Sequence, residues 1–163
     1  MLGDELRAAG ERAGHLLRER GETVAVAEGS CGGLISAALL AVPGASTYYV
    51  GGSVIYTATA KRGLLGDVID TPPKLRGATE EWTRYLARAI RAKLDTTWGI
   101  GEGGAAGPAN PYGDPAGHAW FAVAGPVEQA RHVLTGEDDR ATNMAAFAIA
   151  ALSLLEETLD SAP

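Results

Sequence analysis

A short glycine-rich segment carries most of the residues that could do chemistry. A brief apolar run leads directly into Gly29, Ser30, Cys31, Gly32 and Gly33. Where a strand passes through glycines into a helix, free backbone N–H groups can bind a phosphate or a carboxylate. Ser30 adds a hydroxyl and Cys31 a thiol, which a helix N-terminus would make more acidic. The segment matches neither the dinucleotide-binding nor the P-loop pattern, so spacing alone favours a plain strand-to-helix turn with Ser30 as the helix N-cap.

Two acidic residues, Glu28 and Glu102, stand at the ends of the first and third expected strands. If these strands are neighbours in a parallel sheet, both carboxylates lie at the edge where open α/β folds bind ligands. Together they could hold a divalent cation or take part in acid–base chemistry. We favour the alternative that Glu28 makes a structural hydrogen bond and Glu102 is solvated, and we therefore expect no metal site.

Further polar candidates lie near the end of the chain. Arg140 precedes the last helix and could meet a phosphate, although a salt bridge to Asp138 or Asp139 would explain it as well. His118 is expected to be a hairpin residue and His132 a surface residue.

The elements that must position these residues follow from hydrophobic periodicity, which predicts alternating helices and strands and so an α/β layered domain. We expect helices over residues 4–20, 34–41, 58–65, 79–94 and 140–159. We expect strands over residues 23–27, 51–57, 96–101, 118–124 and 128–134, the last two forming an antiparallel hairpin. A loop rich in Gly, Pro and Asn is expected over residues 103–117. The site should lie at the carboxyl ends of the first three strands.

Length and composition restrict the class of protein. The 163 residues are enough for a single domain, expected over residues 1–163. A net charge of −6 argues against a bulk electrostatic interaction with nucleic acid or anionic lipid. The single cysteine excludes an internal disulfide. Apolar runs fall short of the roughly 20 residues that a membrane-spanning helix needs, and no signal-peptide pattern begins the chain. We expect a cytoplasmic protein without nucleic-acid or membrane partners.

The motifs resemble those of the CinA C-terminal domain family, the nicotinamide mononucleotide deamidases. Residues 23–34 are similar to the family's opening motif, a strand followed by Ala-Glu-Ser-Cys-Thr-Gly-Gly. Further similar blocks follow in order at residues 42–46, 52–56, 60–61, 64–66, 103–108, 115–118 and 136–140. The resemblance implies a standalone form of the domain. It also implies a three-layer α/β/α sandwich with a mixed, mostly parallel sheet of about five strands.

The family's chemistry assigns roles to particular residues. Its members hydrolyse the carboxamide of nicotinamide mononucleotide to the acid and release ammonia, without a cofactor. The mechanism inferred for them uses a serine nucleophile with a lysine as its base. Lys61 matches that lysine, and Tyr56 matches a tyrosine of the same pocket. Since a lysine is a base only when burial or positive charge lowers its pKa, we expect Lys61 to lie in the pocket.

Two pocket hydroxyls of the family are glycines in this chain. The position of the serine nucleophile is Gly29, and the position of a second hydroxyl is Gly103. Because glycine cannot attack a carbonyl, this loss should remove most of the rate enhancement. Ser30 or Cys31 as a displaced nucleophile, with Lys61 as its base, stays an alternative.

Two main functions and one further option therefore stay open. The first is an amidohydrolase acting on nicotinamide mononucleotide or a related amide, and the second is a catalytically inactive nucleotide-binding or interaction protein that retains the pocket. A third is a different reaction in the roomier pocket that two glycines create. The expected catalytic residues are Lys61, Ser30 and Tyr56. The expected substrate-binding residues are Glu28, Gly29, Cys31, Gly32, Gly33, Gly103, Gly104, Ala105, Gly107 and Arg140. Exposed apolar helix stripes and the habit of the family also lead us to expect a homo-oligomer.

Overall fold

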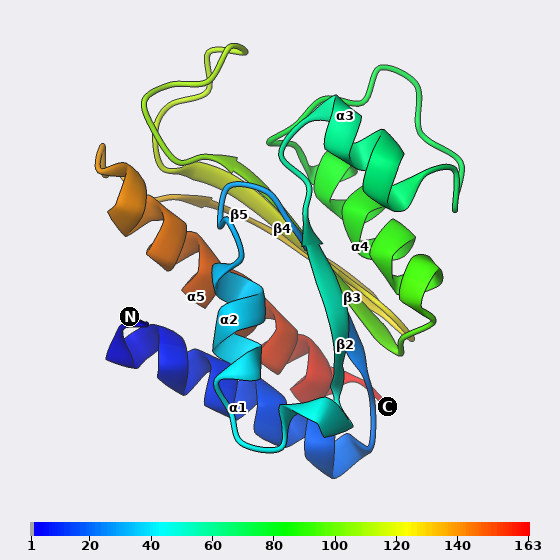
Figure 1. Cartoon of the computed structure of the whole chain (residues 1–163). Helices are drawn as coiled ribbons and strands as arrows, with labels where there is room; N and C mark the ends of the chain where they lie inside the picture. Colours follow the sequence, from blue (N-terminus) through cyan, green and yellow to red (C-terminus); the bar gives the residue numbers. More distant parts are fainter. Residues whose placement is uncertain (1) are drawn as a thin grey trace.

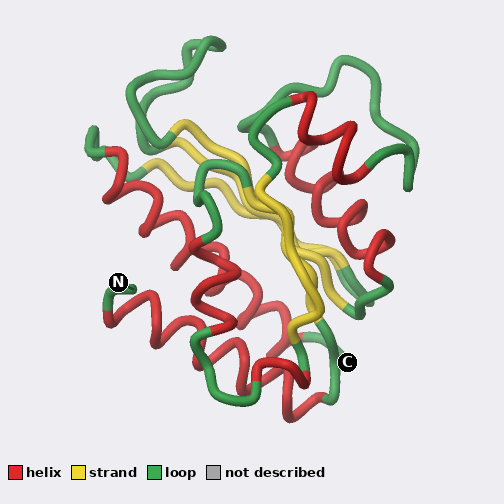
Figure 2. The backbone as a smooth tube through the Cα atoms, viewed as in Figure 1, coloured by secondary structure: helices red, strands yellow, loops and turns green. Residues whose placement is uncertain are grey.

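Helices cover both faces of a central sheet in the computed structural model, which describes residues 2–163 (Figures 1 and 2). Three helices pack together on one face: α1 (Asp4–Arg20), α2 (Leu34–Leu40) and α5 (Arg140–Ser161). The other face is covered by α4 (Glu80–Leu94). The expected three-layer α/β/α sandwich is confirmed. None of the helices in the described part of the chain combines the length and the apolar character needed to cross a membrane.

The sheet has five strands in the order β2-β1-β3-β4-β5. Their bounds are β1 (Val24–Glu28), β2 (Tyr49–Val54), β3 (Trp98–Ala105), β4 (His118–Ala124) and β5 (Glu128–Leu134). β1 pairs in parallel with both β2 and β3, while β4 runs antiparallel to β3 and β5. The sheet is thus mixed, as expected: β4 runs against the direction shared by the other four strands. The carboxyl ends of β1, β2 and β3 meet at one edge.

Short helical turns connect the elements around this edge. The 3-10 turn η1 (Ala45–Thr47) precedes β2. After β2 the chain enters α3 (Ala58–Ala60) and continues as the π-helical turn η2 (Lys61–Leu65). These two turns lie beside α4 on its face of the sheet, so Lys61 is carried to the side of the sheet that α4 covers (Figure 1).

β1 is buried along its whole length and divides the core in two. Val24 and Val26 join the apolar cluster beneath α1, α2 and α5. Ala25 and Ala27 join the cluster on the side of α4. Side chains alternate between the two faces of a strand, so this five-residue run contributes to both cores.

Glycines on one face of β3 allow α4 to approach the sheet closely. A Cβ atom at Gly99 would overlap the backbone oxygen of Ala87, and one at Gly101 would overlap the backbone oxygen of Thr83. Only glycine leaves room for a helix backbone at this distance. The same close approach brings the first turn of α4 against the end of β3.

The observed β3 is longer than the sequence predicted. We expected a strand over 96–101 and a loop over 103–117, whereas β3 continues through Gly103 and Gly104 to its end at Ala105. Both glycines pair with residues of β4. Glycine favours loops locally, but the antiparallel partner supplies the hydrogen bonds that make the segment a strand. Glu102 consequently lies inside β3 rather than at its end.

Candidate functional site

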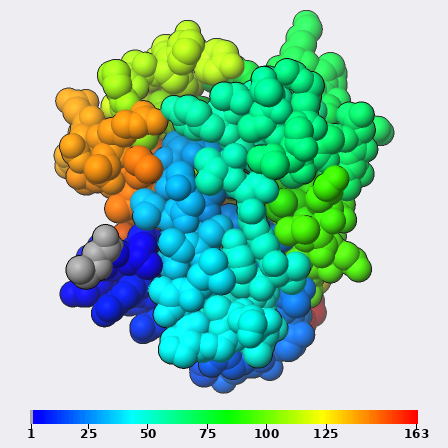
Figure 3. Space-filling view, in the orientation of Figure 1, coloured from blue at the N-terminus to red at the C-terminus, as the bar shows by residue number. Residues whose placement is uncertain are grey.

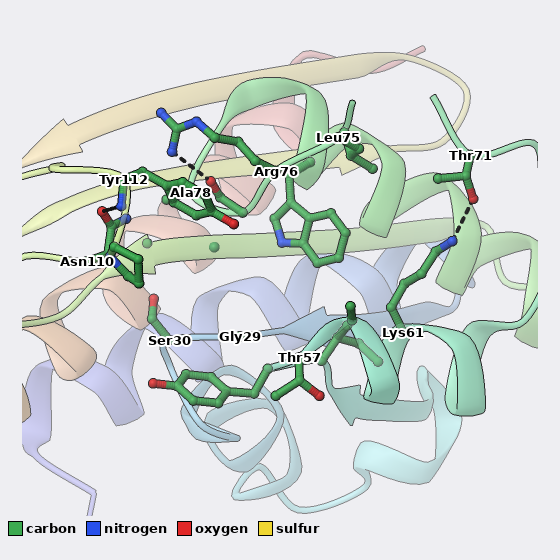
Figure 4. Close-up of a pocket in the computed structure, with 18 of the residues that line it drawn as sticks. Gly29, Ser30, Thr57, Lys61, Thr71, Leu75, Arg76, Ala78, Asn110 and Tyr112 are labelled. Atoms are coloured by element: carbon green, nitrogen blue, oxygen red, sulfur yellow. Dashed lines mark hydrogen bonds between the residues drawn. The ribbon is translucent and has the colours of Figure 1, made fainter. Parts of the chain in front are cut away.

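A cavity of about 610 Å³ opens where β1, β2 and β3 end (Figure 4). Gly29 and Ser30 after β1, the segment 55–58 after β2, and Gly103 and Gly104 of β3 line it. The remaining lining residues are Lys61, Arg62, Thr71, Leu75, Arg76, Gly77, Ala78, Trp82, Asn110, Pro111 and Tyr112. The cavity thus lies at the edge of the sheet where the strand pattern predicted a site.

The backbone N–H groups of the glycine-rich loop bind carboxylates of the protein itself. The N–H groups of Gly29 and Cys31 both donate to Glu102 Oε2, at 2.9 Å each. The N–H of Gly33 donates to Glu28 Oε1 at 2.9 Å. These donors are therefore not available to a phosphate, and the interpretation of the loop as a plain strand-to-helix turn agrees better with the structure. Within residues 2–163, the N–H of Ser30 is the one N–H group of loop 29–33 without an acceptor.

Glu28 holds the start of α2. In addition to the Gly33 bond, its carboxylate accepts the N–H of Ile35 at 3.0 Å and both the N–H and the hydroxyl of Ser36 at 2.9 Å. Gly33 is the N-cap residue and supplies no side chain, so Glu28 does the work that the sequence assigned to Ser30. The expected structural role of Glu28 agrees with this geometry. Among residues 2–163, no three His, Cys, Asp or Glu side chains are grouped so that they could hold a metal ion.

Glu102 is completely buried, which corrects the expectation that it is solvated. Its side chain lies beneath the loop that follows β1, where Ser30 also donates its hydroxyl to Glu102 Oε1. Burial raises the pKa of this carboxyl, while the bonds from Ser30, Cys31 and Gly29 act in the opposite direction. The prediction was wrong because β3 runs past this residue into its pairing with β4.

Ser30 and Cys31 have opposite environments. Ser30 is 5% exposed and lines the cavity. Cys31 is fully buried in the apolar cluster beneath α2 and α5. Burial raises the pKa of the Cys31 thiol well above its ordinary value, with the negative charges of Glu102 and Glu28 acting in the same direction. Cys31 is therefore neither acidified nor exposed to the cavity, and this geometry does not favour its expected roles as a displaced nucleophile and as a substrate contact.

Gly29 occupies the position that the resemblance assigns to the nucleophile. A Cβ atom there would lie 3.2 Å from the backbone oxygen of Ile55 and 3.3 Å from that of Glu102. A side chain at position 29 would thus project between the ends of β2 and β3, where the two backbone oxygens leave room for a Cβ atom only if they shift slightly. No hydroxyl is present at this point of the cavity.

The space beside Gly103 is filled by an indole. A Cβ atom at Gly103 would lie 2.8 Å from Cδ1 of Trp82. Trp82 stands in the first turn of α4, where its backbone N–H donates to the N-cap hydroxyl of Thr79 at 3.2 Å. The interpretation that two glycines create a roomier pocket is therefore wrong at this position, because an aromatic ring replaces the missing hydroxyl.

Lys61 lines the cavity, as expected, but it does not contact a serine. Its ammonium donates to Thr71 Oγ1 at 2.6 Å and lies 5.2 Å from the ring centre of Tyr85. Figure 4 shows the side chain extending toward Thr71, on the opposite side of the view from Ser30. The hydroxyl of Ser30 is bonded to Glu102 instead. The expected pairing of Ser30 with Lys61 as its base is therefore absent from this geometry.

Tyr56 and Arg140 meet at the rim. Tyr56 is 65% exposed and lines the cavity, and its hydroxyl accepts a bond from Arg140 at 3.0 Å. Arg140 also donates to the backbone oxygen of Gly107 at 2.6 Å. The loop after β3 and the start of α5 accordingly lie side by side in Figure 3. These bonds hold Arg140, in place of the salt bridge to Asp138 or Asp139 that we weighed.

The charges that line the cavity are all positive. Lys61, Arg62 and Arg76 are basic, and the lining contains no acidic residue. Arg76 forms a salt bridge with Asp114, with 2.9 Å between Nη1 and Oδ2, and its Cζ lies 4.6 Å from the ring centre of Tyr112. Lys61 and Arg62 have no salt-bridge partner within residues 2–163. Aromatic rings of Tyr56, Trp82 and Tyr112 complete the wall. The cavity therefore suits an anion that also carries a planar ring.

Sequence reasoning missed part of this wall. The missed residues come from α4, which carries Trp82, and from two segments without hydrophobic periodicity. One segment, before α4, carries Leu75 and Arg76, and the other, after β3, carries Asn110 and Tyr112. Only Trp82 gave a signal, as an aromatic residue in the first turn after a strong N-cap. The expected substrate-binding residues that do not line the cavity are Glu28, Cys31, Gly32, Gly33, Ala105, Gly107 and Arg140.

Comparison with known proteins gives one consistent result. A model of the CinA C-terminal domain matches residues 7–159. A CinA-like protein of Synechocystis sp. is 40% identical over 131 residues, 78% of this chain and 31% of that protein. A CinA-like protein of Salinibacter ruber is 37% identical over 148 residues, 90% of this chain and 36% of that protein. The chain thus spans about a third of the length of these relatives. The crystal structure of a competence damage-inducible protein from Klebsiella pneumoniae superposes with a TM-score of 0.87 at 26% identity, covering 96% of this chain and 98% of that one.

Proposed function

The chain belongs to the CinA C-terminal domain family, and from that premise we propose that it binds a ligand of the nicotinamide-nucleotide type without hydrolysing the carboxamide by a serine–lysine mechanism. The ligand would lie in the cavity at the ends of β1, β2 and β3. The observation that carries the proposal is the combination of a glycine at position 29 with a lysine whose ammonium is bonded to Thr71.

The ligand class rests on charge and shape. The whole chain has a net charge of −6, yet the charged residues of the cavity are Lys61, Arg62 and Arg76. A phosphate is attracted by such a local excess of positive charge and forms strong charge-assisted hydrogen bonds with it. A nicotinamide ring is planar and can stack on the indole of Trp82. The volume of about 610 Å³ is in the range of small-molecule sites.

The loss of hydrolysis rests on the attacking group. A serine–lysine mechanism needs a hydroxyl within hydrogen-bond reach of the lysine. Gly29 supplies no hydroxyl, and Ser30, the serine that lines the cavity, donates its hydroxyl hydrogen bond to Glu102. Gly103 likewise supplies no second hydroxyl, and the indole of Trp82 occupies the space beside it. The cavity wall thus contains the lysine and a local positive charge, but no serine hydroxyl at position 29 or 103.

The binding half of the proposal is tested by calorimetry. We expect nicotinamide mononucleotide to bind, and nicotinamide riboside, which lacks the phosphate, to bind at least about tenfold more weakly. Arg62→Gln should weaken nucleotide binding, whereas Arg7→Gln, an exposed change on the remote helix α1, should not. Equal affinity for nucleotide and riboside, or no binding of either, would contradict this half.

The catalytic half is tested by ammonia release from nicotinamide mononucleotide. We expect no release above background from the unmodified protein. Gly29→Ser alone should also fail to restore turnover, because Lys61 is directed toward Thr71. Ammonia release by the unmodified protein that disappears in Lys61→Met would show that the serine–lysine mechanism operates after all.

A further inference from the structure

We propose that Ser30 and Glu102 form a nucleophile–base pair that takes up an acyl group from a carboxylic ester bound in the cavity. The pair differs from the family's serine–lysine arrangement in both members, since Ser30 is one position beyond the lost nucleophile and Glu102 replaces the lysine. The activity does not depend on the nicotinamide-nucleotide ligand of the previous section.

The geometry places an activated hydroxyl at the cavity wall. Ser30 lines the cavity and is 5% exposed, so its oxygen is within reach of a bound ester but screened from bulk water. Its hydroxyl proton is already directed at Glu102 Oε1. A hydroxyl becomes a useful nucleophile when a neighbouring base accepts its proton in this way.

Glu102 has the properties of a base rather than of an ion-pair partner. All three of its hydrogen bonds come from the loop after β1, namely from the N–H groups of Gly29 and Cys31 and from the hydroxyl of Ser30. The two N–H bonds converge on Oε2 and fix the carboxylate, which leaves Oε1 to the serine. Burial raises the pKa of Glu102, which makes it a stronger base than an exposed carboxylate.

The loop also offers a donor for the negative charge that develops on the ester oxygen. The N–H of Ser30 is the loop amide that has no acceptor in the described part of the chain. A backbone N–H next to a nucleophile can stabilise the oxyanion of a tetrahedral intermediate.

A second serine–glutamate pair, which joins the end of β1 to α2, serves as an internal reference. Ser36 donates its hydroxyl to Glu28 Oε2 at 2.9 Å, but neither residue lines the cavity. Glu28 also accepts three N–H bonds at the start of α2, so its part is structural. The two pairs share their chemistry and differ in access to the cavity.

The reaction balances within the pair and water. Ser30 Oγ forms a bond to the ester carbonyl carbon while its proton passes to Glu102. The bond from that carbon to the alcohol oxygen breaks, and the alcohol leaves with the proton. Water then attacks the acyl-serine and gives a proton to Glu102, the bond to Ser30 Oγ breaks, and Oγ recovers the proton as the carboxylic acid leaves. No cofactor, oxidant or reductant is consumed.

The test uses p-nitrophenyl acetate and the full-length protein. We expect a burst of p-nitrophenol stoichiometric with protein, followed by slow turnover, and an acetyl group on the peptide that contains Ser30 by mass spectrometry. The acylation rate should rise with pH as Glu102 loses its proton and then level off. Acetylation of a lysine or tyrosine in place of Ser30 would overturn the proposal.

The variants separate chemistry from folding. Ser30→Ala should abolish the burst, and Glu102→Gln should slow acylation by roughly 100-fold or more, the usual contribution of a general base. The glutamine can keep its oxygen toward the N–H groups of Gly29 and Cys31 and point its amide at Ser30, so the loop should stay folded. Ser36→Ala, the matched control, should acylate like the unmodified protein.

The outcomes are distinguishable from those of the nucleotide proposal. A burst that persists in Ser30→Ala, or that is unchanged in a folded Glu102→Gln protein, would refute the nucleophile–base pair. Such a result would leave the nucleotide titration unaffected. Conversely, a protein that fails to bind nicotinamide mononucleotide but acetylates Ser30 would contradict the proposed ligand and support the pair.

Discussion

Replacing Glu28 with alanine tests whether buried carboxylates, rather than a bound anion, hold the glycine-rich loop. Glu28 is buried at the end of β1 and accepts four hydrogen bonds from the start of α2. Glu28→Ala leaves three backbone N–H groups and the Ser36 hydroxyl without their acceptor. We expect a large loss of stability, centred on the junction between β1 and α2.

The magnitude follows from the number and burial of these donors. A buried donor that loses its partner costs about 1–3 kcal/mol, and such costs are not additive. Ile35 is fully buried, whereas Gly33 and Ser36 are partly exposed and can regain water. We therefore expect Glu28→Ala to lower the free energy of unfolding by about 3–5 kcal/mol, and Glu28→Gln, which keeps one acceptor oxygen, by about 1–3 kcal/mol.

Urea unfolding followed by circular dichroism measures these differences, provided that the variants share one m-value. The control is Glu11→Ala, which removes an exposed carboxylate of α1 and should change stability by less than about 0.5 kcal/mol. A loss of less than about 1 kcal/mol in Glu28→Ala would refute the reasoning, because the N–H groups would then have another acceptor or access to water.

Three further predictions concern single residues. Gly103→Ser should lower the free energy of unfolding, measured in urea, by about 1–3 kcal/mol, because its Cβ would lie 2.8 Å from the indole of Trp82. The same loss of stability when Gly103→Ser is made in a Trp82→Ala background would contradict this reasoning. Cys31 should react with a disulfide reagent at least about 100-fold more slowly in the folded protein than in urea, and equal rates would show that the thiol is accessible. His132 Nε2 lies 2.7 Å from His118 Nδ1, and burial, with His118 as the smaller cause, lowers the pKa of His132 in the folded state. The unfolded chain therefore takes up this proton first, so stability should fall as the pH drops through the ordinary histidine range. The loss should be smaller in His132→Gln, and an NMR titration that places the His132 pKa above the ordinary value would refute it.

The sequence predicted elements well where the signal is local. The helix over residues 4–20 has the predicted bounds, and Gly21 ends it in the left-handed conformation that glycine favours. The extension of β3 to Ala105 was missed because Gly103 and Gly104 suggest a loop when they are considered alone. Their meaning depends on β4 beside them and α4 above them, which are distant in sequence.

The site was predicted in the same unequal way. The edge of the sheet, and the presence of Tyr56 and Lys61 at the cavity, followed from strand order and from the resemblance. The sequence did not predict the direction of the Lys61 side chain or the burial of Glu102, because both depend on partners that only the tertiary structure supplies. These partners are Thr71 for the lysine and the loop after β1 for the glutamate.

The position of β2 at the margin of the sheet gives the two sides of the cavity different mechanical properties. β2 is bonded to β1 alone, and its end leads directly to Tyr56 and the turn that carries Lys61. Ser30 and Gly103, in contrast, follow or belong to strands that have a neighbour on each side. Amide hydrogens of β2 should accordingly exchange with deuterium sooner than those of β1 and β3. We therefore expect the side of the cavity formed by β1 and β3 to be rigid, and the side that follows β2 to move when ligands of different size bind.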